Sequence, residues 1–573
     1  MSKVNNNGGY STQMDIKRVF PFLGWPAITK ESFRADLIAG LTVALVAIPQ
    51  SLAYAQLAGV PAYFGLYAAF IPTIVGALFG SSRQLSTGPV AMTSLLTAAS
   101  VAQLAPHGSE LFYSYVILLA LLSGLFQIAF GMLRMGVMLN FLSHPVLMGF
   151  INAAAIIIGL SQLPALVGIP SRQSAHFLVD IWQVIDHLDS GHGASVIFGV
   201  TALLMLICFK RFAPKLPGVL ITVTTLTLAS YELGYVNMGG RVVGEIPKGL
   251  PSFSVPPFDW HASMALMSAA FVIALISFME AMSSSKVIAI KTRVAWDENQ
   301  ELVAQGLAKV AAAFSHSMPV SGSFSRSALN LAAQAMTGLA SVFSASFVLL
   351  TLLYFTPLLY HLPKPVLAAI IMMAVGGLID FKVIKKSWKA GRDDGLAAVI
   401  TFASTLLFAP NIQNGIVTGI ILSLALLLYR MMKPRIALLG THSDGTLRDL
   451  QRLGLPQLHS KLSAIRFDGS LRFVNVSYFE DAMLKLERDN PAIKYILIAG
   501  NGINDIDASG IDLLSNLITR FRGNGIDLGF SGLKNQVMEI MRTTGLLDQI
   551  GDAHLFASDQ DALNIILPRL EQM

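Results

Sequence analysis

The chain has 573 residues, of which 54% are hydrophobic and 13% are charged, and its mean hydropathy is +0.61. Soluble globular proteins carry about 25% charged residues, so this composition excludes an ordinary soluble protein and predicts an α-helical, polytopic membrane protein. The net charge of +6 is too small to indicate a nucleic-acid partner. The single cysteine, Cys208, excludes a disulfide framework and a cysteine-based metal site.

Three regions follow one another along the chain. Residues 1–34 begin polar, without the pattern of a cleaved signal peptide, and we expect a cytoplasmic N-terminal segment. Residues 35–433 carry the apolar runs of a transmembrane domain, with halves at about 35–234 and 260–433. Residues 440–573 are polar again and form a separate cytoplasmic domain.

The membrane domain contains about fourteen apolar runs. Basic residues cluster after the even-numbered runs, for example Lys382, Lys385 and Lys386 after the twelfth. Basic loops stay in the cytoplasm, so both termini should be cytoplasmic in a protein of the cell (inner) membrane. The runs lie at about 36–59, 61–80, 89–102, 111–133, 143–166, 194–209, 217–233, 262–285, 300–315, 326–340, 341–360, 365–380, 394–410 and 413–432.

Two runs are too short to cross a membrane. One opens at Ser86-Thr87-Gly88-Pro89 and the other at Ser325-Arg326, and each offers roughly 20 Å of helix against a hydrocarbon core of about 30 Å. Each is the third run of a set of seven and follows a Ser/Gly-rich turn, and Pro89 suits position N1 of a helix. Corresponding short segments in two halves predict a seven-plus-seven inverted repeat with the substrate site between them.

The second short run carries an arginine, Arg326, within Val320–Gln334. Ser321, Gly322 and Ser323 supply turn and N-cap chemistry, so the helix should begin near Phe324 or Ser325. A guanidinium in lipid must be paired, hydrated or used. Beside a helix N-terminus, with its unpaired N–H groups and positive dipole end, it makes an anion site.

The C-terminal region alternates short β-rich runs with amphipathic helical stretches, which predicts an α/β domain. A polar turn, Asn501–Gly510, follows a predicted buried strand and precedes a helix. The predicted strands are Ser463–Phe467, Ile493–Ala499 and Ile526–Phe530, and the predicted helices are Val476–Arg488, Ile511–Arg520 and Gln536–Thr543.

These features together resemble the SulP (sulfate permease) family of anion transporters, from about Ala35 to the end. Ile48–Tyr67 reads IPQSLAYAQLAGVPAYFGLY and Gly80–Ala91 reads GSSRQLSTGPVA, while DIDASG at Asp505–Gly510 resembles the loop of a STAS domain. The resemblance implies a core and a gate domain, an elevator-like motion and a homodimer.

The resemblance also implies a site. Family members bind the anion between the N-termini of the third and tenth helices, here Val90 against Ser325 and Arg326. Polar or aromatic side chains of the first helix complete it, here Gln50 and Tyr54. Structural interpretations stay open, because the Gln50 amide can cap carbonyls freed by the proline before it and Tyr54 can simply pack.

An acidic residue on the eighth helix lies near the anion in symporting members, and Glu280 matches it. Some sodium-coupled relatives carry an aspartate there and a threonine four residues on, where this chain has Glu280 and Ser284. The coupling ion is therefore open between a proton, which we favour, and sodium. Glu280 also has a structural interpretation, an ion pair with Arg326.

Ser509 matches the position that is phosphorylated in bacterial anti-sigma-factor antagonists with the STAS fold. A phosphate before a helix is electrostatically favourable, so Ser509 is a candidate regulatory phosphosite, and the domain a candidate site for a cytoplasmic protein partner. The alternative is that Ser509 is an unmodified helix cap.

We therefore predict a secondary-active transporter of a small inorganic oxyanion, sulfate first, by proton-coupled symport. No G-x-x-x-x-G-K-[ST] motif, zinc-ligand spacing or nucleophile elbow occurs, so we expect neither ATP-driven transport nor an enzyme, and no cofactor or metal. Alternatives are a bicarbonate or C4-dicarboxylate symporter, coupled to protons or sodium, and an anion exchanger. An anion-responsive sensor that signals through the STAS domain is a further alternative.

Overall fold

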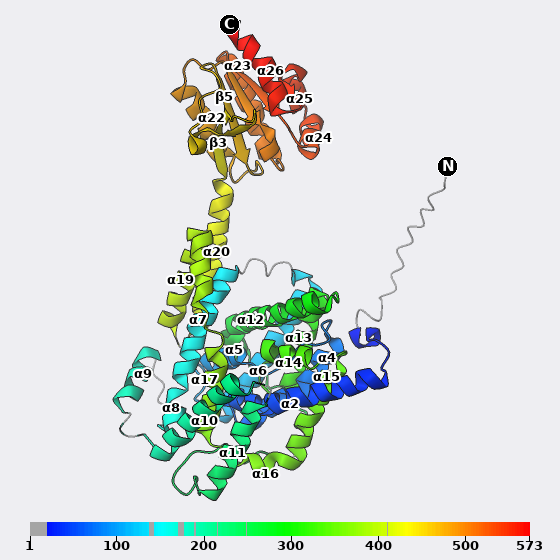
Figure 1. Cartoon of the computed structure of the whole chain (residues 1–573), viewed down its shortest axis with the longest axis vertical. Helices are drawn as coiled ribbons and strands as arrows, with labels where there is room; N and C mark the ends of the chain where they lie inside the picture. The colour runs from blue at the N-terminus through cyan, green and yellow to red at the C-terminus, as the bar shows by residue number, and fades with distance from the viewer. Residues whose placement is uncertain are drawn as a thin grey trace, which may run out of the picture. The chain divides into compact units, whose positions relative to one another are not determined.

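The structure is a computed structural model that describes residues 20–136, 143–169, 177–187, 189, 191–214, 216–247, 249–409 and 411–572. Residues 1–19 of the predicted N-terminal segment lie outside the described residues. The chain divides into two compact units, Met1–Ser423 and Leu424–Met573 (Figure 1). The boundary precedes residue 433, where we predicted the membrane domain to end.

The first seven predicted membrane segments are helical, and their ends lie close to the predicted runs. The short 3-10 helix η1 (Pro21–Gly24) precedes them, and the amphipathic helix α9 (Phe177–Asp186) was not predicted. The segments are α2 (Lys30–Leu57), α3 (Ala62–Ala68) with α4 (Ile71–Phe79), α5 (Ala91–Val101), α6 (Glu110–Met132), α7 (His144–Ser161) with α8 (Leu163–Val167), α10 (Gly193–Phe212) and α11 (Gly218–Glu232).

The second seven segments follow the same order. An unpredicted amphipathic helix, α18 (Phe381–Ala390), carries the basic residues that follow the twelfth segment. The segments are α12 (Trp260–Thr292), α13 (Glu298–Phe314), α14 (Phe324–Ala332), α15 (Leu339–Leu350) with η4 (Thr351–Phe355) and α16 (Thr356–Leu359), α17 (Lys364–Gly376), α19 (Arg392–Phe408) and α20 (Ile412–Met432).

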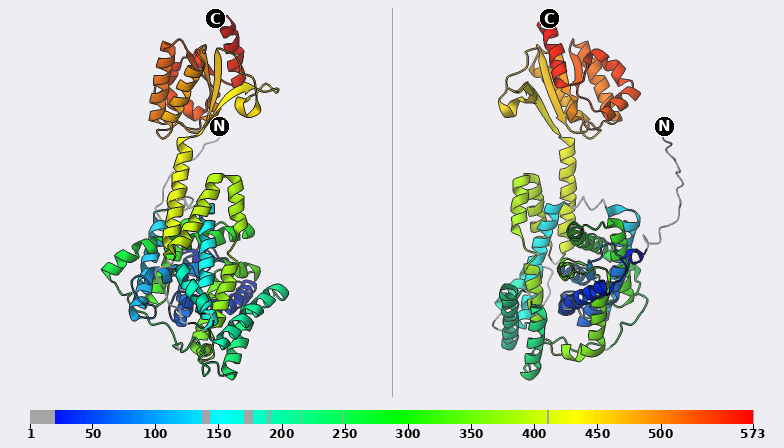
Figure 2. Two further views of the ribbon diagram at one scale, coloured as in Figure 1. Left: turned by 90° about the vertical axis from the view of Figure 1, so that its left-hand side faces the viewer. Right: turned by 45° about the vertical axis from the view of Figure 1, so that its right-hand side comes forward.

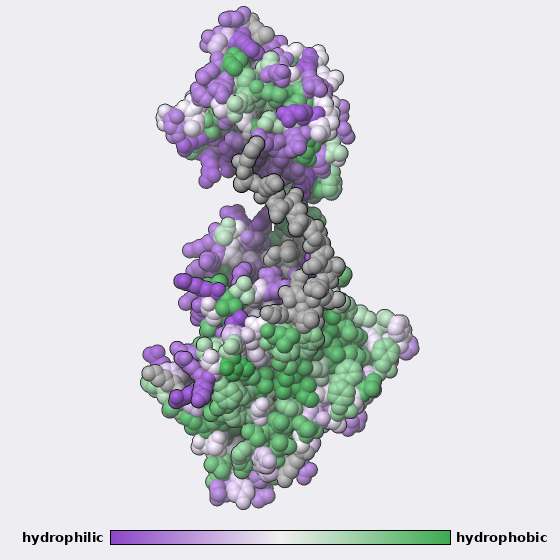
Figure 3. All heavy atoms as spheres, turned by 90° about the vertical axis from the view of Figure 1, so that its right-hand side faces the viewer, coloured by the Kyte–Doolittle hydropathy of each residue, from purple (hydrophilic) through white to green (hydrophobic). Residues whose placement is uncertain are grey.

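The helix lengths fit a membrane protein with two half-helices. Within the described ranges, nine helical stretches are long and apolar enough to cross a membrane. The segments α5 and α14 are shorter, as predicted, and so are α11, α13 and α19. Hydrophobic residues cover a broad face of the first unit, whereas hydrophilic residues dominate the visible face of the second (Figure 3).

Two short strands precede the half-helices. β1 (Ser86–Gly88) and β2 (Ser321–Ser323) are fully buried and pair antiparallel, with Thr87 opposite Gly322. Equivalent segments related by an axis in the membrane plane run antiparallel, so this pairing fits the predicted inverted repeat. The prediction of turns here was wrong, because each extended segment satisfies the backbone of the other inside the protein.

The helices of the membrane unit pack in two groups. In the core group, α6 packs on α12 and α13, α4 on α13, and α2 on α15, with β1 and β2 among them. In the gate group, α7 packs on α17 and α19, and α10 packs on α17. The two groups correspond to the predicted core and gate domains.

The second unit is an α/β domain with a six-stranded sheet of order β4-β3-β5-β6-β7-β8. Strands β5 to β8 are parallel, and β3 is antiparallel to β4 and β5. The strands are β3 (Arg435–Thr441), β4 (Leu447–Asp449), β5 (Leu462–Asp468), β6 (Tyr495–Ala499), β7 (Asp527–Ser531) and β8 (Leu555–Phe556). The predicted strands are confirmed. Strand β3 begins at Arg435, before residue 440, where we predicted the domain to start.

Helices cover both faces of this sheet (Figure 2). One apolar core joins the sheet to α22, α23, α24 and α25, and a second joins its other face to α26. The helices are α21 (Leu450–Leu453), α22 (Val476–Asp489), α23 (Ala508–Gly523), α24 (Asn535–Thr543), α25 (Leu546–Ile550) and α26 (Asp559–Glu571).

Asp507 caps helix α23. Its carboxylate accepts hydrogen bonds from the backbone N–H of Gly510 at 3.0 Å and of Phe473 at 2.9 Å. Ser509 lies in the first turn and is partly exposed. The interpretation of Ser509 as the helix cap is therefore wrong, and its role as a phosphosite stays a prediction.

Replacing the cap tests this assignment. We expect Asp507→Ala to lower the free energy of unfolding of the second unit by about 1 kcal/mol, because two backbone N–H groups lose their acceptor. Ser509→Ala is the matched control and should change it by less than about 0.5 kcal/mol. Hydrogen exchange of the α23 amides in the full-length protein measures both, and equal losses of protection would contradict the assignment.

Candidate functional site

The pairing of β1 with β2 brings two helix N-termini to one place. α5 begins at Ala91 after the N-cap Val90, so the prediction that Pro89 occupies position N1 was wrong. α14 begins at Phe324, as predicted, and its N-cap Ser323 accepts a hydrogen bond from the backbone N–H of Arg326 at 3.4 Å. Helix N-termini carry unpaired N–H groups and a partial positive charge.

A cavity of about 420 Å³ lies between these N-termini. Five of the predicted site residues line it, namely Gln50, Tyr54, Val90, Glu280 and Ser325. The other lining residues are Ala91, Met92, Leu147, Ile151, Ile276, Met279, Ser283, Gly322, Ser323, Phe324, Ala374, Gly377 and Leu378.

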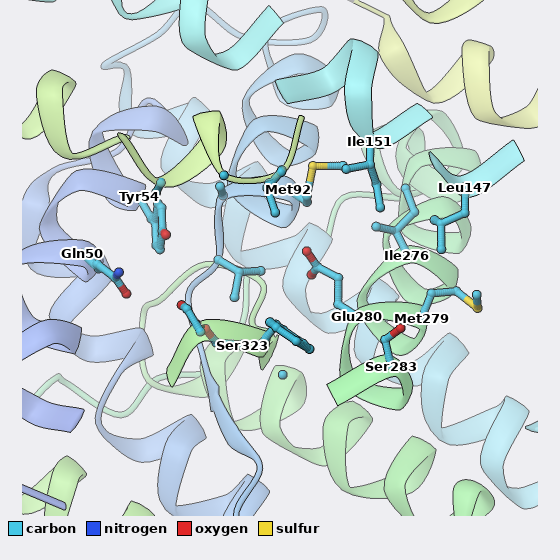
Figure 4. Close-up of a pocket in the computed structure, with 18 residues that line it drawn as sticks. Gln50, Tyr54, Met92, Leu147, Ile151, Ile276, Met279, Glu280, Ser283 and Ser323 are labelled. Carbon is cyan, nitrogen blue, oxygen red and sulfur yellow. Dashed lines mark hydrogen bonds between the residues drawn. The ribbon is translucent and has the colours of Figure 1, made fainter. Parts of the chain in front are cut away.

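Among the described residues that line the cavity, the polar side chains all belong to the core group. Gln50 and Tyr54 on α2 point their polar ends toward the space into which the Glu280 carboxyl on α12 projects (Figure 4). The gate group contributes apolar or small residues, among them Leu147 and Ile151 on α7. One wall can therefore hold a charged ligand, while the described residues of the facing wall present apolar or small side chains to it.

Arg326 lies behind this polar wall and does not itself line the cavity. Its side chain is only 2% exposed. Nη1 donates to the carbonyl oxygen of Pro89 at 2.9 Å, and Nε donates to Ser86 Oγ at 3.4 Å. The guanidinium thereby joins the segment before α5 to the first turn of α14.

Three predicted site residues each have a buried polar atom without a partner in the described part of the chain. These atoms are Gln50 Oε1, Glu280 Oε2 and Arg326 Nη2. Buried polar atoms in folded proteins are nearly always hydrogen-bonded, so unpaired ones need an explanation. An oxyanion accepts hydrogen bonds and cannot donate them. A protonated Glu280 carboxyl can donate to it, and so can the Gln50 amide once its NH₂ group faces the cavity. Arg326 acts from behind the cavity wall through its charge.

Ser284 lies outside the cavity. It is buried, and its hydroxyl donates to the backbone carbonyl of Glu280 at 3.0 Å, one helical turn earlier. The structure therefore brings together Gln50, Tyr54, Val90, Glu280 and Ser325, with Arg326 behind them, but turns Ser284 away.

A buried network that the sequence analysis missed holds β1 in place. Thr73 on α4 donates to the carbonyl of Thr87 at 2.8 Å, and Gln305 on α13 donates to Thr87 Oγ1 at 2.7 Å. Ser327 Oγ accepts from the backbone N–H of Ser86 at 2.9 Å. These neutral residues carry no sequence signal, because Ser, Thr and Gln are common in membrane helices that contact one another.

Lys309 is a second residue that the sequence analysis did not identify. It is a fully buried cation on α13, beside α6 and α12. An ionisable residue in the middle of an apolar run was the signal that could have identified it.

Comparison with known proteins agrees with this architecture. The profile of the sulfate permease family matches residues 33–401, and that of the STAS domain matches residues 456–562. Sulfate transporter 4.1, chloroplastic, of Arabidopsis thaliana is 31% identical over 577 residues, covering 96% of this chain and 83% of its own. The sodium-independent sulfate anion transporter of Bos taurus is 30% identical over 571 residues, covering 93% and 89%.

Solved structures share the fold. Murine Solute Carrier 26 family member A9, an anion transporter in the inward-facing state, superposes with a TM-score of 0.88 at 22% identity, over 99% of this chain and 97% of that chain. The transmembrane domain of the cyanobacterial bicarbonate transporter BicA has a TM-score of 0.59 at 23% identity, over 68% and 98%.

Gly88 permits the close approach of the arginine. A Cβ atom at this position would lie 2.9 Å from Arg326 Nη2, which is closer than packed atoms tolerate. We expect Gly88→Ala to displace the guanidinium and to weaken anion binding by about tenfold or more. Gly193→Ala is the control, because its Cβ would meet no atom within 4 Å. Titration calorimetry with sulfate measures both, and unchanged binding in Gly88→Ala would contradict this placement.

Proposed function

Because the chain belongs to the sulfate permease family, we propose that it is a secondary-active transporter of a small inorganic oxyanion, with sulfate as the first candidate. The observation that carries the proposal is the convergence of two helix N-termini and one buried arginine on a cavity with unpaired polar atoms. N–H groups, dipoles and a cation favour an anion. The plant and bovine relatives are both named as sulfate transporters.

The proposed coupling ion is a proton carried by Glu280. Its carboxyl is the acidic group of the cavity wall, and Oε2 has no partner in the described chain. Sodium coupling needs several oxygen ligands around the ion, and the Ser284 hydroxyl already bonds the helix backbone outside the cavity. The name of the bovine relative, sodium-independent, also argues against sodium.

An elevator-like motion of the core group against the gate group is part of the proposal. The polar cavity wall belongs to the core group, so the anion can move with it, while the apolar residues of α7 and α17 slide past without breaking polar contacts. Homodimer formation and a protein partner or phosphorylation at Ser509 are further proposals. We also place the protein in the cell membrane with both termini in the cytoplasm.

Bicarbonate, a C4-dicarboxylate or anion exchange remain alternatives, since they use the same chemical groups. The fold shared with BicA, a bicarbonate transporter, favours bicarbonate among them. A sensor that binds without transporting needs no carboxyl in the cavity, so Glu280 favours transport.

Uptake of labelled sulfate into proteoliposomes tests transport directly. Inward proton and sodium gradients are imposed separately, and we expect the proton gradient alone to drive uptake. Arg326→Ala should abolish it, because the fixed cation beside the helix N-termini is lost. If sulfate enters under neither gradient, the sulfate assignment fails, and bicarbonate and dicarboxylates are tested in the same vesicles.

Two further variants separate the coupling ions. Glu280→Gln keeps a neutral group in the cavity, so uptake should persist but lose its dependence on pH. Ser284→Ala should leave uptake within about twofold of wild type, because its hydroxyl only bonds the helix backbone. Loss of a sodium-driven component in Ser284→Ala would instead establish sodium coupling.

A further inference from the structure

A buried lysine lies behind the anion cavity. Lys309 is 0% exposed, and its Nζ donates to Gln127 Oε1 on α6 and to Ser277 Oγ on α12. Gln127 turns its acceptor toward the lysine and leaves its own Nε2 without a partner in the described chain. An amide takes this orientation beside an ammonium, which donates hydrogen bonds and accepts none.

This lysine interacts with the cavity through charge. Ser277, which accepts a hydrogen bond from Lys309, lies one turn before Glu280 on α12, so the ammonium and the carboxyl interact through their charges without forming a salt bridge. The other ionisable groups that face Glu280 are Arg326 on α14 and Tyr54 on α2. Two cations, Lys309 and Arg326, therefore act on the single carboxyl of Glu280.

Two other buried carboxylates of the core group accept hydrogen bonds from backbone N–H groups and do not face Lys309 or Arg326. Glu301 accepts from the backbone N–H groups of Ser81 and Ser82, each at 3.0 Å. Asp36 accepts from the backbone N–H of Met336 at 2.7 Å. Neither carboxylate lines the cavity. The excess positive charge of Lys309 and Arg326 is thus left for a ligand to balance.

We propose that Lys309 sets the charge of the transported anion, because together with Arg326 it gives the cavity two fixed positive charges. A divalent anion then binds with a proton on Glu280, and a monovalent anion binds with Glu280 ionised. Both combinations sum to zero, and a neutral loaded core avoids the cost of moving net charge through lipid. The inference rests on the proposed anion transport and deepens it by linking the charge of the substrate to the protonation of Glu280.

Substitutions change the fixed charge in unit steps. Glu280→Gln keeps the fixed charge of the cavity at two positive charges, from Arg326 and Lys309, which matches a divalent anion. Glu280→Gln combined with Lys309→Met holds it at one, which matches a monovalent anion. The double variant buries no uncompensated carboxyl, so it is expected to fold even if Lys309→Met alone does not.

Sulfate and nitrate are suitable probes, since both are small oxyanions and differ in charge. Titration calorimetry on the purified full-length protein at pH 6 gives the ratio of their dissociation constants. We expect this ratio to favour sulfate most in Glu280→Gln and to shift toward nitrate by about tenfold or more in the double variant. A loss of packing alone would weaken both anions alike and leave the ratio unchanged.

Lys309→Arg and Gln127→Met are the matched controls. The first keeps the cation and the second removes a neutral partner of the lysine, so both should keep the wild-type ratio within about threefold. Equal ratios in Glu280→Gln and the double variant would overturn the inference and leave the proposed function intact. A wild-type protein that binds neither anion would overturn both.

Discussion

The contact on which the membrane unit depends is the one between the Arg326 guanidinium and the Pro89 carbonyl, across the pairing of β1 with β2. Half-helices leave extended backbone in the middle of the protein, where no water can satisfy it. The two strands satisfy each other's backbone hydrogen bonds. The arginine links the first turn of α14 to the segment that precedes α5. The same arrangement directs two sets of unpaired N–H groups and one cation toward a single cavity.

Charge and packing are divided between the two helix groups. The core group carries Arg326, Lys309, Glu280 and the polar lining, while the gate group offers an apolar surface. An ion bound to the core group therefore keeps its partners if that group moves. The charges that bind the anion also decide how much net charge would have to cross the lipid, so binding and coupling depend on the same few residues.

Much of this organisation follows from the sequence, because half-helix length, the serine-rich segments before the half-helices and an arginine in an apolar run are local signals. Gln50, Tyr54 and Glu280 came through family resemblance, and the structure brings them to one cavity. The strand pairing could not be predicted, because three-residue strands far apart in the chain have no periodicity to recognise. Ser284 points away because its hydroxyl bonds its own helix, a choice that spacing cannot reveal.

The most direct test of this account is an experimental structure of the full-length protein with bound selenate, a divalent oxyanion that scatters more strongly than sulfate. The account predicts density for selenate between the first turns of α5 and α14, in contact with the polar wall that Gln50 and Glu280 share. Selenate bound elsewhere, with this cavity empty, would contradict it.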